Sequence, residues 1–188
     1  MPRRVVVLDA NLLVPIVACD FLLTAADHGL FEPLVSASIL EEVERNLIEL
    51  RPDIDPDRLR RRVGYMRTAL ADNIIDTEPR PSEPAAINAK DRHVALAALG
   101  GHADLVATND ADLRVQIGPG KFAFGAVSGD DFVAELWASS PAEVALVIDS
   151  LIAKRRTPPI MPERMAEQLR VHFPIAANAW LESLNREM

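Results

Sequence analysis

The sequence predicts an α/β fold in which helices flank a central parallel sheet, followed by an all-helical C-terminal extension. Apolar, β-branched runs at residues 4–8 and 105–108 have the composition of strands buried on both faces. Between them lie segments whose apolar residues recur at helical spacing, an alternation typical of parallel sheets with right-handed crossovers. Beyond about residue 129 only helical patterns remain. We therefore expect an α/β domain over residues 1–136 and a helical extension over residues 137–188.

Strand and helix patterns alternate through the first half of the chain. The clearest helix covers residues 38–50, where Ile39, Val43 and Leu47 recur at helical spacing. Ser38 followed by Glu41 resembles a capping box at the start of this helix. The expected elements are strand 4–8, helix 16–27, strand 31–35, helix 38–50, helix 57–71 and strand 73–76.

The second half of the chain begins with a proline-containing loop at residues 77–86 and ends in helices alone. The amphipathic helices near the C-terminus carry an apolar face that includes Met165, Leu169 and Phe173. Such a face must be buried, either against the chain's own domain or in an interface with a partner. The expected elements are helix 91–99, strands 105–108 and 122–127, and helices 130–138, 142–155, 163–172 and 175–186.

Composition predicts a soluble, cytoplasmic globular protein. The 188 residues are 49% hydrophobic, contain a single cysteine and include no apolar run of the ~18 residues that a membrane span needs. The net charge of −8 argues against a bulk nucleic-acid binder, which would usually be basic, but it allows local basic patches. The candidate nucleic-acid contacts, or alternatively parts of solvated helix faces, are Arg60, Arg61, Arg62, Arg155 and Arg156.

Four acidic residues stand where a strand or helix is expected to begin or end, or within a helix close to the sheet. They are Asp9, Glu42, Asp91 and Asp110. Ligands of open parallel sheets collect beyond the carboxyl ends of the strands, so these side chains can meet in one pocket. Gathered carboxylates repel one another unless a cation joins them, and hard oxygen ligands favour Mg²⁺ or Mn²⁺. Each residue alone has a structural alternative, because Asp also caps helices and forms turns. Together they predict metal-dependent chemistry on phosphate esters.

Four segments, taken in order, resemble the PIN-domain ribonucleases and in particular the VapC-type toxins of bacterial toxin–antitoxin pairs. A subgroup of these toxins is similar in carrying a helical C-terminal extension. The segments are Val-Val-Val-Leu-Asp-Ala-Asn at 5–11, Ser-Ala-Ser-Ile-Leu-Glu-Glu-Val-Glu-Arg-Asn-Leu at 36–47, Lys-Asp-Arg-His-Val-Ala-Leu-Ala at 90–97 and Ala-Asp-Leu-Val-Ala-Thr-Asn-Asp-Ala-Asp-Leu at 103–113.

The resemblance implies a PIN-like three-layer fold and a Mg²⁺-dependent endoribonuclease, with Mn²⁺ as a substitute metal. It also implies an RNA substrate, a small antitoxin as partner and a homodimer. The catalytic and metal-binding residues that it implies are Asp9, Glu42, Asp91 and Asp110, with Asp9 and Asp110 in direct contact with the metal.

Several neighbouring residues are assigned less firmly by the same resemblance. Glu41 competes with Glu42, which we prefer because it lies five residues before Leu47, as in the family pattern. Asp112 is either a fifth, outer acid or the cap of a turn. Asn11 and Thr108 either position metal-bound water and orient a carboxylate or satisfy the ends of strands and turns.

Two further residues and two alternative functions complete the predictions. His93 lies two residues past Asp91 on a helix, so we expect it to face away from the acids. Cys19 is expected in the core. A haloacid-dehalogenase-like phosphatase also begins with a strand ending in Asp, but Asn11 replaces its second Asp and no lysine follows the strand at Thr108. The other alternative is a non-catalytic binding module that uses its C-terminal helices for a protein partner.

Overall fold

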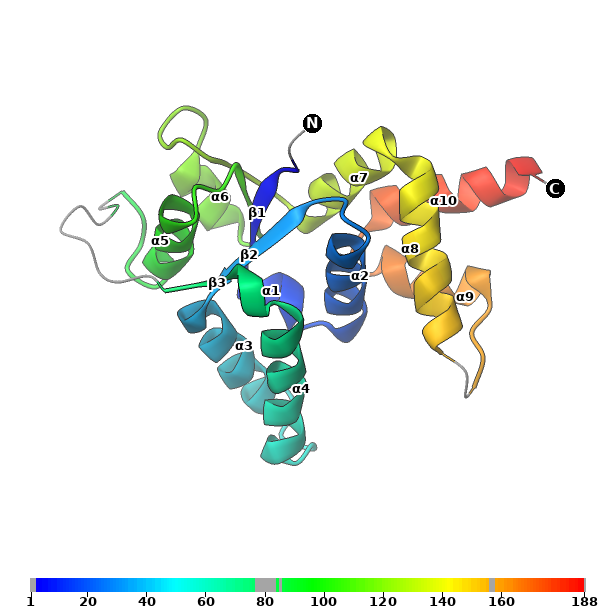
Figure 1. The fold of residues 1–188 in the computed structure, drawn as a ribbon, viewed down its shortest axis with the longest axis horizontal. Helices are drawn as coiled ribbons and strands as arrows, with labels where there is room; N and C mark the ends of the chain where they lie inside the picture. The colour runs from blue at the N-terminus through cyan, green and yellow to red at the C-terminus, as the bar shows by residue number, and fades with distance from the viewer. Residues whose placement is uncertain (1–2, 77–83, 85, 156–157, 188) are drawn as a thin grey trace.

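A five-stranded parallel sheet forms the centre of the molecule, as predicted (Figure 1). The computed structural model describes residues 3–76, 84, 86–155 and 158–187. The strand order is β3-β2-β1-β4-β5. The strands are β1 (Val5–Leu8), β2 (Glu32–Ser36), β3 (Ile74–Ile75), β4 (Leu105–Ala107) and β5 (Gly125–Val127).

Helices flank the sheet and continue beyond it to the C-terminus. In Figure 1, α5 and α6 lie to the left of the sheet, α2 and the C-terminal helices to the right, and α3 with α4 project below. The helices are α1 (Ala10–Leu13), α2 (Ile16–Asp27), α3 (Ala37–Leu50), α4 (Pro56–Ala69), α5 (Arg92–Gly100), α6 (Ala111–Ile117), α7 (Gly129–Ser139), α8 (Pro141–Lys154), α9 (Pro162–Arg170) and α10 (Pro174–Glu187), with a 3-10 turn, η1, at Ala71–Asn73.

The register of the central strands determines where the acidic residues lie. β1 pairs with β2 on one side and with β4 on the other, and all of these pairings are parallel. Leu8 pairs with Ala107, so the residues that follow, Asp9 and Thr108, are level at the carboxyl edge of the sheet. The Asp9 amide continues the ladder by donating to the Ala107 carbonyl at 3.1 Å. The chain then turns immediately into α1, which carries Asn11.

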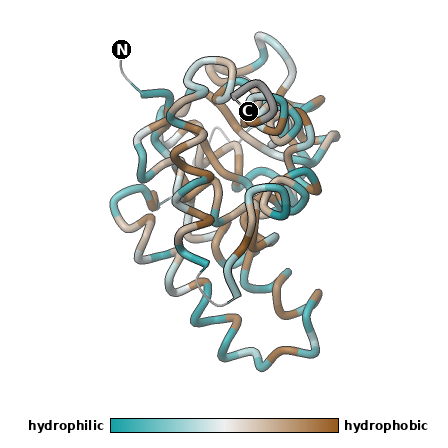
Figure 2. Tube along the Cα trace, turned by 90° about the vertical axis from the view of Figure 1, so that its right-hand side faces the viewer, coloured by the Kyte–Doolittle hydropathy of each residue, from teal (hydrophilic) through white to brown (hydrophobic). Residues whose placement is uncertain are grey.

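The helical extension shares one hydrophobic core with the sheet domain. The predicted apolar face is buried, with Met165, Leu169 and Phe173 at most 2% exposed. The centroid of the Phe173 ring lies 5.5 Å from the centroid of the Phe21 ring on α2. Figure 2 shows hydrophobic segments running through the middle of the molecule. Of the two sequence alternatives, the structure therefore supports packing against the chain's own domain, and the division at residue 136 stays a prediction.

Truncating Phe173 to alanine is expected to destabilise the whole protein. Removing a fully buried aromatic ring costs about 3–5 kcal/mol, because the cavity left behind closes only partly. The measurement is urea unfolding followed by far-UV circular dichroism, with exposed Val171→Ala as the control. Two separate transitions, with only the smaller one shifted, would instead mean that the extension folds independently.

Some sequence predictions of local structure were wrong. The N-cap of α3 lies two residues before the proposed cap Ser38, because it is the Ser36 hydroxyl that accepts a hydrogen bond from the Ile39 amide, at 3.2 Å. The short helices α1 and α6 were not predicted. The loop predicted at 77–86 lies mostly outside the described residues. No single helix in the described ranges is long and apolar enough to span a membrane, and α7 with α8 reach that length only across a bend of 117°.

Candidate active site

Asp9 is a buried carboxylate at the carboxyl edge of the sheet. Its side chain is held by three donors and only 6% of the residue is exposed. Oδ1 accepts from the Ala10 amide at 2.7 Å, while Oδ2 accepts from the Thr108 hydroxyl at 2.5 Å and from the Asn11 amide group at 2.6 Å. Burial raises the pKa of Asp9 above its usual value, although the Thr108 and Ala10 hydrogen bonds oppose this shift. Burying the Asp9 carboxylate in its charged form therefore lowers the stability of the folded protein.

Thr108 and Asn11 fix the orientation of Asp9. The Thr108 hydroxyl donates to Asp9 and accepts from the Asn11 side chain and from the Asp110 amide, both at 3.0 Å, so its hydrogen-bonding capacity is used in full. The Asn11 side-chain oxygen accepts from the Asn109 amide at 3.0 Å. The sequence left two alternative roles for Asn11 and Thr108: orienting the carboxylate, or satisfying backbone hydrogen-bonding groups at strand ends and turns. The same set of hydrogen bonds serves both roles.

Glu42 faces the site and forms an ion pair with His93. The Glu42 Oε2 atom lies 2.9 Å from His93 Nε2. The distance is that of an ion pair, but the ring N–H does not point directly at the carboxylate oxygen. This contact raises the pKa of His93 and lowers the pKa of Glu42. The Glu42 charge also contributes to the raised pKa of Asp9, after burial. Glu41 is exposed and lines a separate outer cavity with Glu44 and Arg45, so the geometry favours Glu42.

The prediction that His93 faces away from the acids was wrong. His93 is half-buried, and its charge acts on Glu42, Asp9 and Asp91. The helical-spacing argument considered only the direction of His93 relative to Asp91, whereas His93 on α5 faces Glu42 on α3. One signal in the sequence could have identified His93 as part of the site. It is a titratable side chain at the start of a helix, two residues after a predicted acid.

Asp91 and Asp110 form the other half of the site. Asp110 Oδ1 caps α6 by accepting from the Leu113 amide at 3.0 Å, and this bond is the main reason for its lowered pKa. Asp91 precedes α5 but makes no side-chain cap, which removes the capping alternative. Its Oδ2 atom is buried and accepts no hydrogen bond from any described residue. Burial, together with the nearby Asp110 charge, raises the pKa of Asp91.

Lys90 lies between these two acids. Its ammonium nitrogen is 3.2 Å from Asp110 Oδ2 and 3.6 Å from Asp91 Oδ2. The Asp110 and Asp91 contacts raise the pKa of Lys90. The side chain is 65% exposed and emerges at the rim of the site. A protein cation thus stands where two predicted metal ligands meet.

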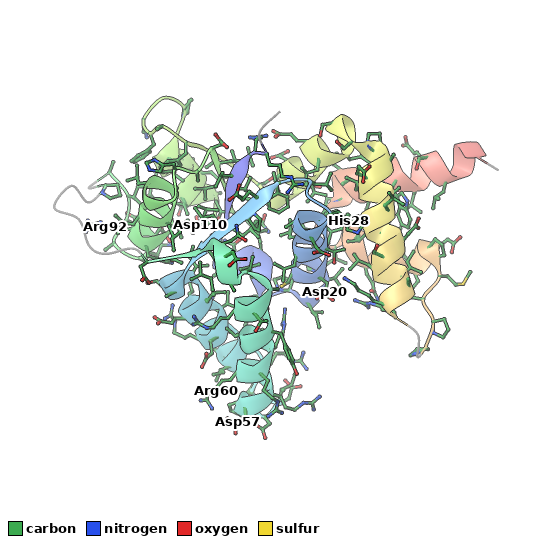
Figure 3. All side chains as sticks on the ribbon, viewed as in Figure 1. Asp20, His28, Asp57, Arg60, Arg92 and Asp110 are labelled. Atoms are coloured by element: carbon green, nitrogen blue, oxygen red, sulfur yellow. The ribbon has the colours of Figure 1, made fainter. Side chains whose placement is uncertain are left out.

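The four predicted acids are brought together as two pairs with His93 between them. Asp9 lies near Glu42, and Asp91 lies near Asp110, which Figure 3 labels beside α6. As the side chains stand, no group of three or more His, Cys, Asp or Glu within the described ranges is arranged to hold a metal ion. The residue types nevertheless fit Mg²⁺, which prefers carboxylate oxygens, and Asp91 offers a buried oxygen that accepts no hydrogen bond from the described residues and lies 3.6 Å from the Lys90 ammonium.

The remaining candidates lie outside this pocket. Asp112 is exposed in the first turn of α6 and does not cap it, because Asp110 does. Arg60 pairs with Asp57 and Glu44, and Arg62 donates to the Leu13 carbonyl at 3.1 Å (Figure 3). The other candidates for nucleic-acid contact are Arg61, Arg155 and Arg156. Arg61 is exposed, and Arg155 contacts Gln168 and Asp20. Arg156 falls outside the described residues. Cys19 is buried as predicted, and burial raises the pKa of its thiol to about 11.

The Glu42–His93 ion pair is expected to make stability depend on pH. The pKa of His93 is raised above 6.5, so the stabilisation is complete below pH 6.5 and is lost as the pH rises through the folded-state pKa. The loss should be about 0.5–1 kcal/mol, because the pair is partly exposed to solvent. Urea unfolding in chelator at roughly pH 6 and roughly pH 8.5 measures it. His93→Gln should lose this pH dependence and the control His28→Gln should retain it. Equal pH dependence in both variants would contradict the pairing.

Comparison with known proteins identifies the family of the chain. The family model described as PIN domain matches residues 5–112, more than half of the sequence. No curated protein and no solved structure gives a match. The matched segment contains all four acids of the pocket and ends before the C-terminal helices.

Proposed function

The chain belongs to the PIN-domain family, and we propose that it is a Mg²⁺-dependent endoribonuclease that acts as the toxin of a type II toxin–antitoxin pair. PIN domains are generally metal-dependent nucleases acting on RNA. The observation that carries the proposal is Asp9, a buried carboxylate oriented by Thr108 and Asn11 where two strands end. An acid placed at this cost to folding indicates a functional role.

In this proposal Asp9 and Asp110 hold Mg²⁺, and Glu42 and Asp91 complete the site. When bound, the metal lowers the pKa of a water molecule and neutralises charge on the phosphate oxygens. Thr108 and Asn11 keep the Asp9 carboxylate in one orientation. Asp91 Oδ2 accepts no hydrogen bond from the described residues, and once the Lys90 ammonium at 3.6 Å is displaced it can accept one from the attacking water. His93 remains beside Glu42 and supplies positive charge near the scissile phosphate.

Partner binding and location are further parts of the proposal. A small antitoxin that covers the acidic pocket, a homodimer and a cytoplasmic location follow from the likeness to VapC-type toxins. Exposed apolar side chains on the α3–α4 hairpin, Leu50 and Tyr65, support a protein partner there, because they are 64% and 74% exposed. The hairpin projects away from the sheet and is accessible to such a partner (Figure 1).

One observation favours the alternative of a non-catalytic binding module. Lys90 and His93 already compensate acids of the pocket, so a protein without metal can keep this arrangement. The family match favours the nuclease over this module and over a haloacid-dehalogenase-like phosphatase. Binding of Mn²⁺ to the purified protein distinguishes the module from the nuclease.

Cleavage by an Asp110→Asn variant tests the proposed function. Asparagine also caps helices, so α6 should stay intact while one anionic ligand is lost. We expect RNA cleavage to fall by roughly 100-fold or more, the size of losing one important electrostatic contact. The control is Asp112→Asn, two residues away and exposed, which should stay within about threefold of wild type.

The assay uses a labelled structured RNA with Mg²⁺, with Mn²⁺ and with chelator. Cleavage that needs metal and disappears only in Asp110→Asn supports the nuclease. Equal cleavage by wild type and Asp110→Asn points to a contaminating nuclease. A comparable loss in Asp112→Asn would make that residue a fifth acid of the site.

A further inference from the structure

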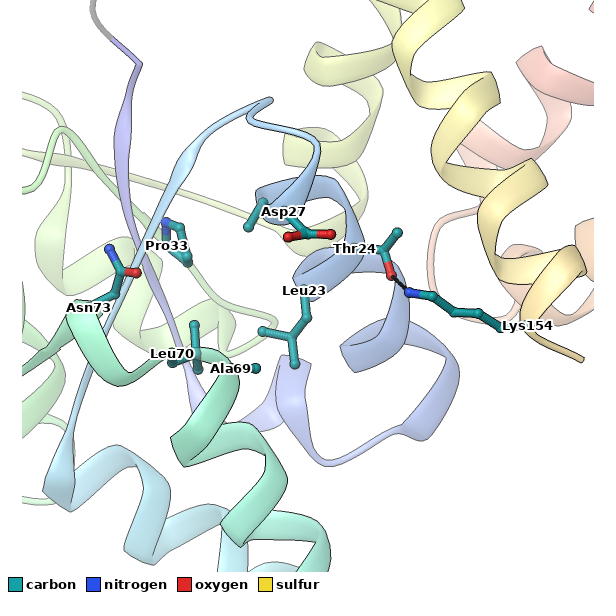
Figure 4. A pocket seen from close by; sticks show the side chains of 9 residues that line it. Leu23, Thr24, Asp27, Pro33, Ala69, Leu70, Asn73 and Lys154 are labelled. Carbon is teal, nitrogen blue, oxygen red and sulfur yellow. Dashed lines mark hydrogen bonds between the residues drawn. The ribbon is translucent and has the colours of Figure 1, made fainter.

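Three neighbouring cavities form a groove that runs from β2 and α4, past α2, to the ends of α8 and α9. Their volumes are about 480, 380 and 690 Å³, and Lys154 at the end of α8 lines all of them. Leu23 and Thr24 line the first two cavities, and Arg155 lines the last two, so the three cavities neighbour one another. Figure 4 shows the first cavity, with Lys154 extending from α8 to Thr24 on α2. We call this the α2–α8 groove.

The end of the groove next to α9 is strongly basic. Among the described residues the cavity there is lined by Lys154, Arg155 and Arg164 and by no acid. The Lys154 ammonium donates to the neutral Thr24 hydroxyl at 3.2 Å, and exposed Arg164 pairs with exposed Glu167 on its own helix. Exposed ion pairs are weak and exchange readily for a stronger anion. In a chain of net charge −8, this concentration of cations indicates an anionic ligand.

Arg62 connects the groove to the segment that carries Asp9. Arg62 on α4 donates to the Leu13 carbonyl, at the end of the four-residue helix that starts directly after Asp9. Asp20 lines the middle cavity, where Arg155 lies 3.9 Å from its carboxylate and the charges of Arg62 and Lys154 also act on it. Cations therefore outnumber this acid between the end of α1 and the groove. An RNA strand whose scissile bond lies at Asp9 can continue along these cations.

We propose that the α2–α8 groove binds the sugar–phosphate backbone of single-stranded RNA next to the cleavage site. The inference rests on the proposed nuclease function, and it names a site for the substrate outside the acidic pocket. The groove residues described include apolar side chains but no aromatic ring, so contacts to phosphate dominate over base stacking. Arg164 and Lys154 supply these contacts, because a guanidinium binds phosphate in bidentate fashion and an ammonium acts as a point charge.

The test measures binding of a labelled single-stranded RNA of about 20 nucleotides, in chelator, to wild type and to Lys154→Gln/Arg164→Gln. Both side chains are exposed, so the substitutions should not disturb folding. Each lost phosphate contact reduces the slope of log affinity against log salt concentration by roughly 0.7. Two lost contacts should therefore weaken binding about 20-fold at 0.1 M salt, taking roughly 1 M salt as the reference at which they contribute nothing. The control is Arg3→Gln/Lys121→Gln, which removes the same charge from exposed positions away from the groove.

Two further arms separate this proposal from the nuclease itself. In the first arm, cleavage and binding are measured with a very short RNA and with a long one. The groove proposal is supported if the wild type cuts both RNAs and the groove variant loses affinity only for the long one. A groove variant with unchanged affinity and salt slope overturns the groove proposal while the nuclease stands. Wild type that binds RNA through the groove but cuts nothing overturns only the nuclease. Loss of poly-glutamate binding with RNA binding retained would assign the groove to an acidic protein partner and overturn the proposal.

Discussion

An Asp9→Asn variant is expected to lose RNA cleavage by roughly 100- to 1000-fold and to lose the rise in melting temperature that Mg²⁺ gives the wild type. Asp9 is the most buried acid of the pocket, and its orientation is fixed from three sides. An amide keeps the shape but removes the charge that attracts the metal. The measurements are RNA cleavage and thermal unfolding, each with Mg²⁺ and with chelator.

The stability of metal-free Asp9→Asn should change by no more than about 1 kcal/mol. Removing a buried charge is favourable, because burial already raises the pKa of Asp9. The amide, however, must turn an N–H group toward either the Ala10 amide or the Thr108 and Asn11 donors, and this opposes the gain. The control is Asp104→Asn, whose carboxylate accepts from the Val5 amide at the opposite edge of the sheet. An Asp9→Asn protein that Mg²⁺ still stabilises as it does the wild type would contradict the proposed metal site.

The sheet and the acids were predictable because both leave a local signal. Valine-rich strands are continuous apolar runs, and an acid directly after such a run lies at the carboxyl edge of a parallel sheet. The register that brings Asp9 level with Thr108 depends on the pairing of β1 with β4, about 100 residues apart, and the sequence predicted only that both strands end at the same edge of a parallel sheet. The burial of Phe173 against Phe21 was left open, because amphipathicity requires a covered face without naming what covers it.

The compensating cations of the site were not predictable in the same way. The Glu42–His93 pair joins α3 to α5, and no spacing along the chain encodes that contact. Lys90 was visible only as the residue before Asp91, and its second contact, to Asp110, comes from the packing of two loops. Helices α1 and α6, at four and seven residues, are too short for helical periodicity to be read. Prediction thus located the acids and missed the groups that neutralise them.

A Lys90→Met variant is expected to bind Mg²⁺ or Mn²⁺ roughly tenfold more tightly than wild type. The Lys90 ammonium lies within 3.2 Å of Asp110 and 3.6 Å of Asp91, so a metal ion must displace it before both acids can act as ligands. Without this ammonium, the two carboxylates lose the cation that contacts both of them. Methionine keeps the length and the apolar stem of the side chain. Isothermal titration of metal into chelator-treated protein gives the affinity directly.

Tighter metal binding in this variant should accompany weaker binding of RNA. Once displaced, the exposed Lys90 ammonium is at the rim of the pocket and can contact a phosphate of the substrate, so its loss should raise KM for RNA several-fold. The control is Lys121→Met, which removes the same charge from a lysine that donates to the backbone carbonyls of Val115 and Gln116. A general effect of net charge would tighten metal binding equally in both variants. Unchanged metal affinity in Lys90→Met would mean that Asp91 and Asp110 bind metal without competition from this lysine.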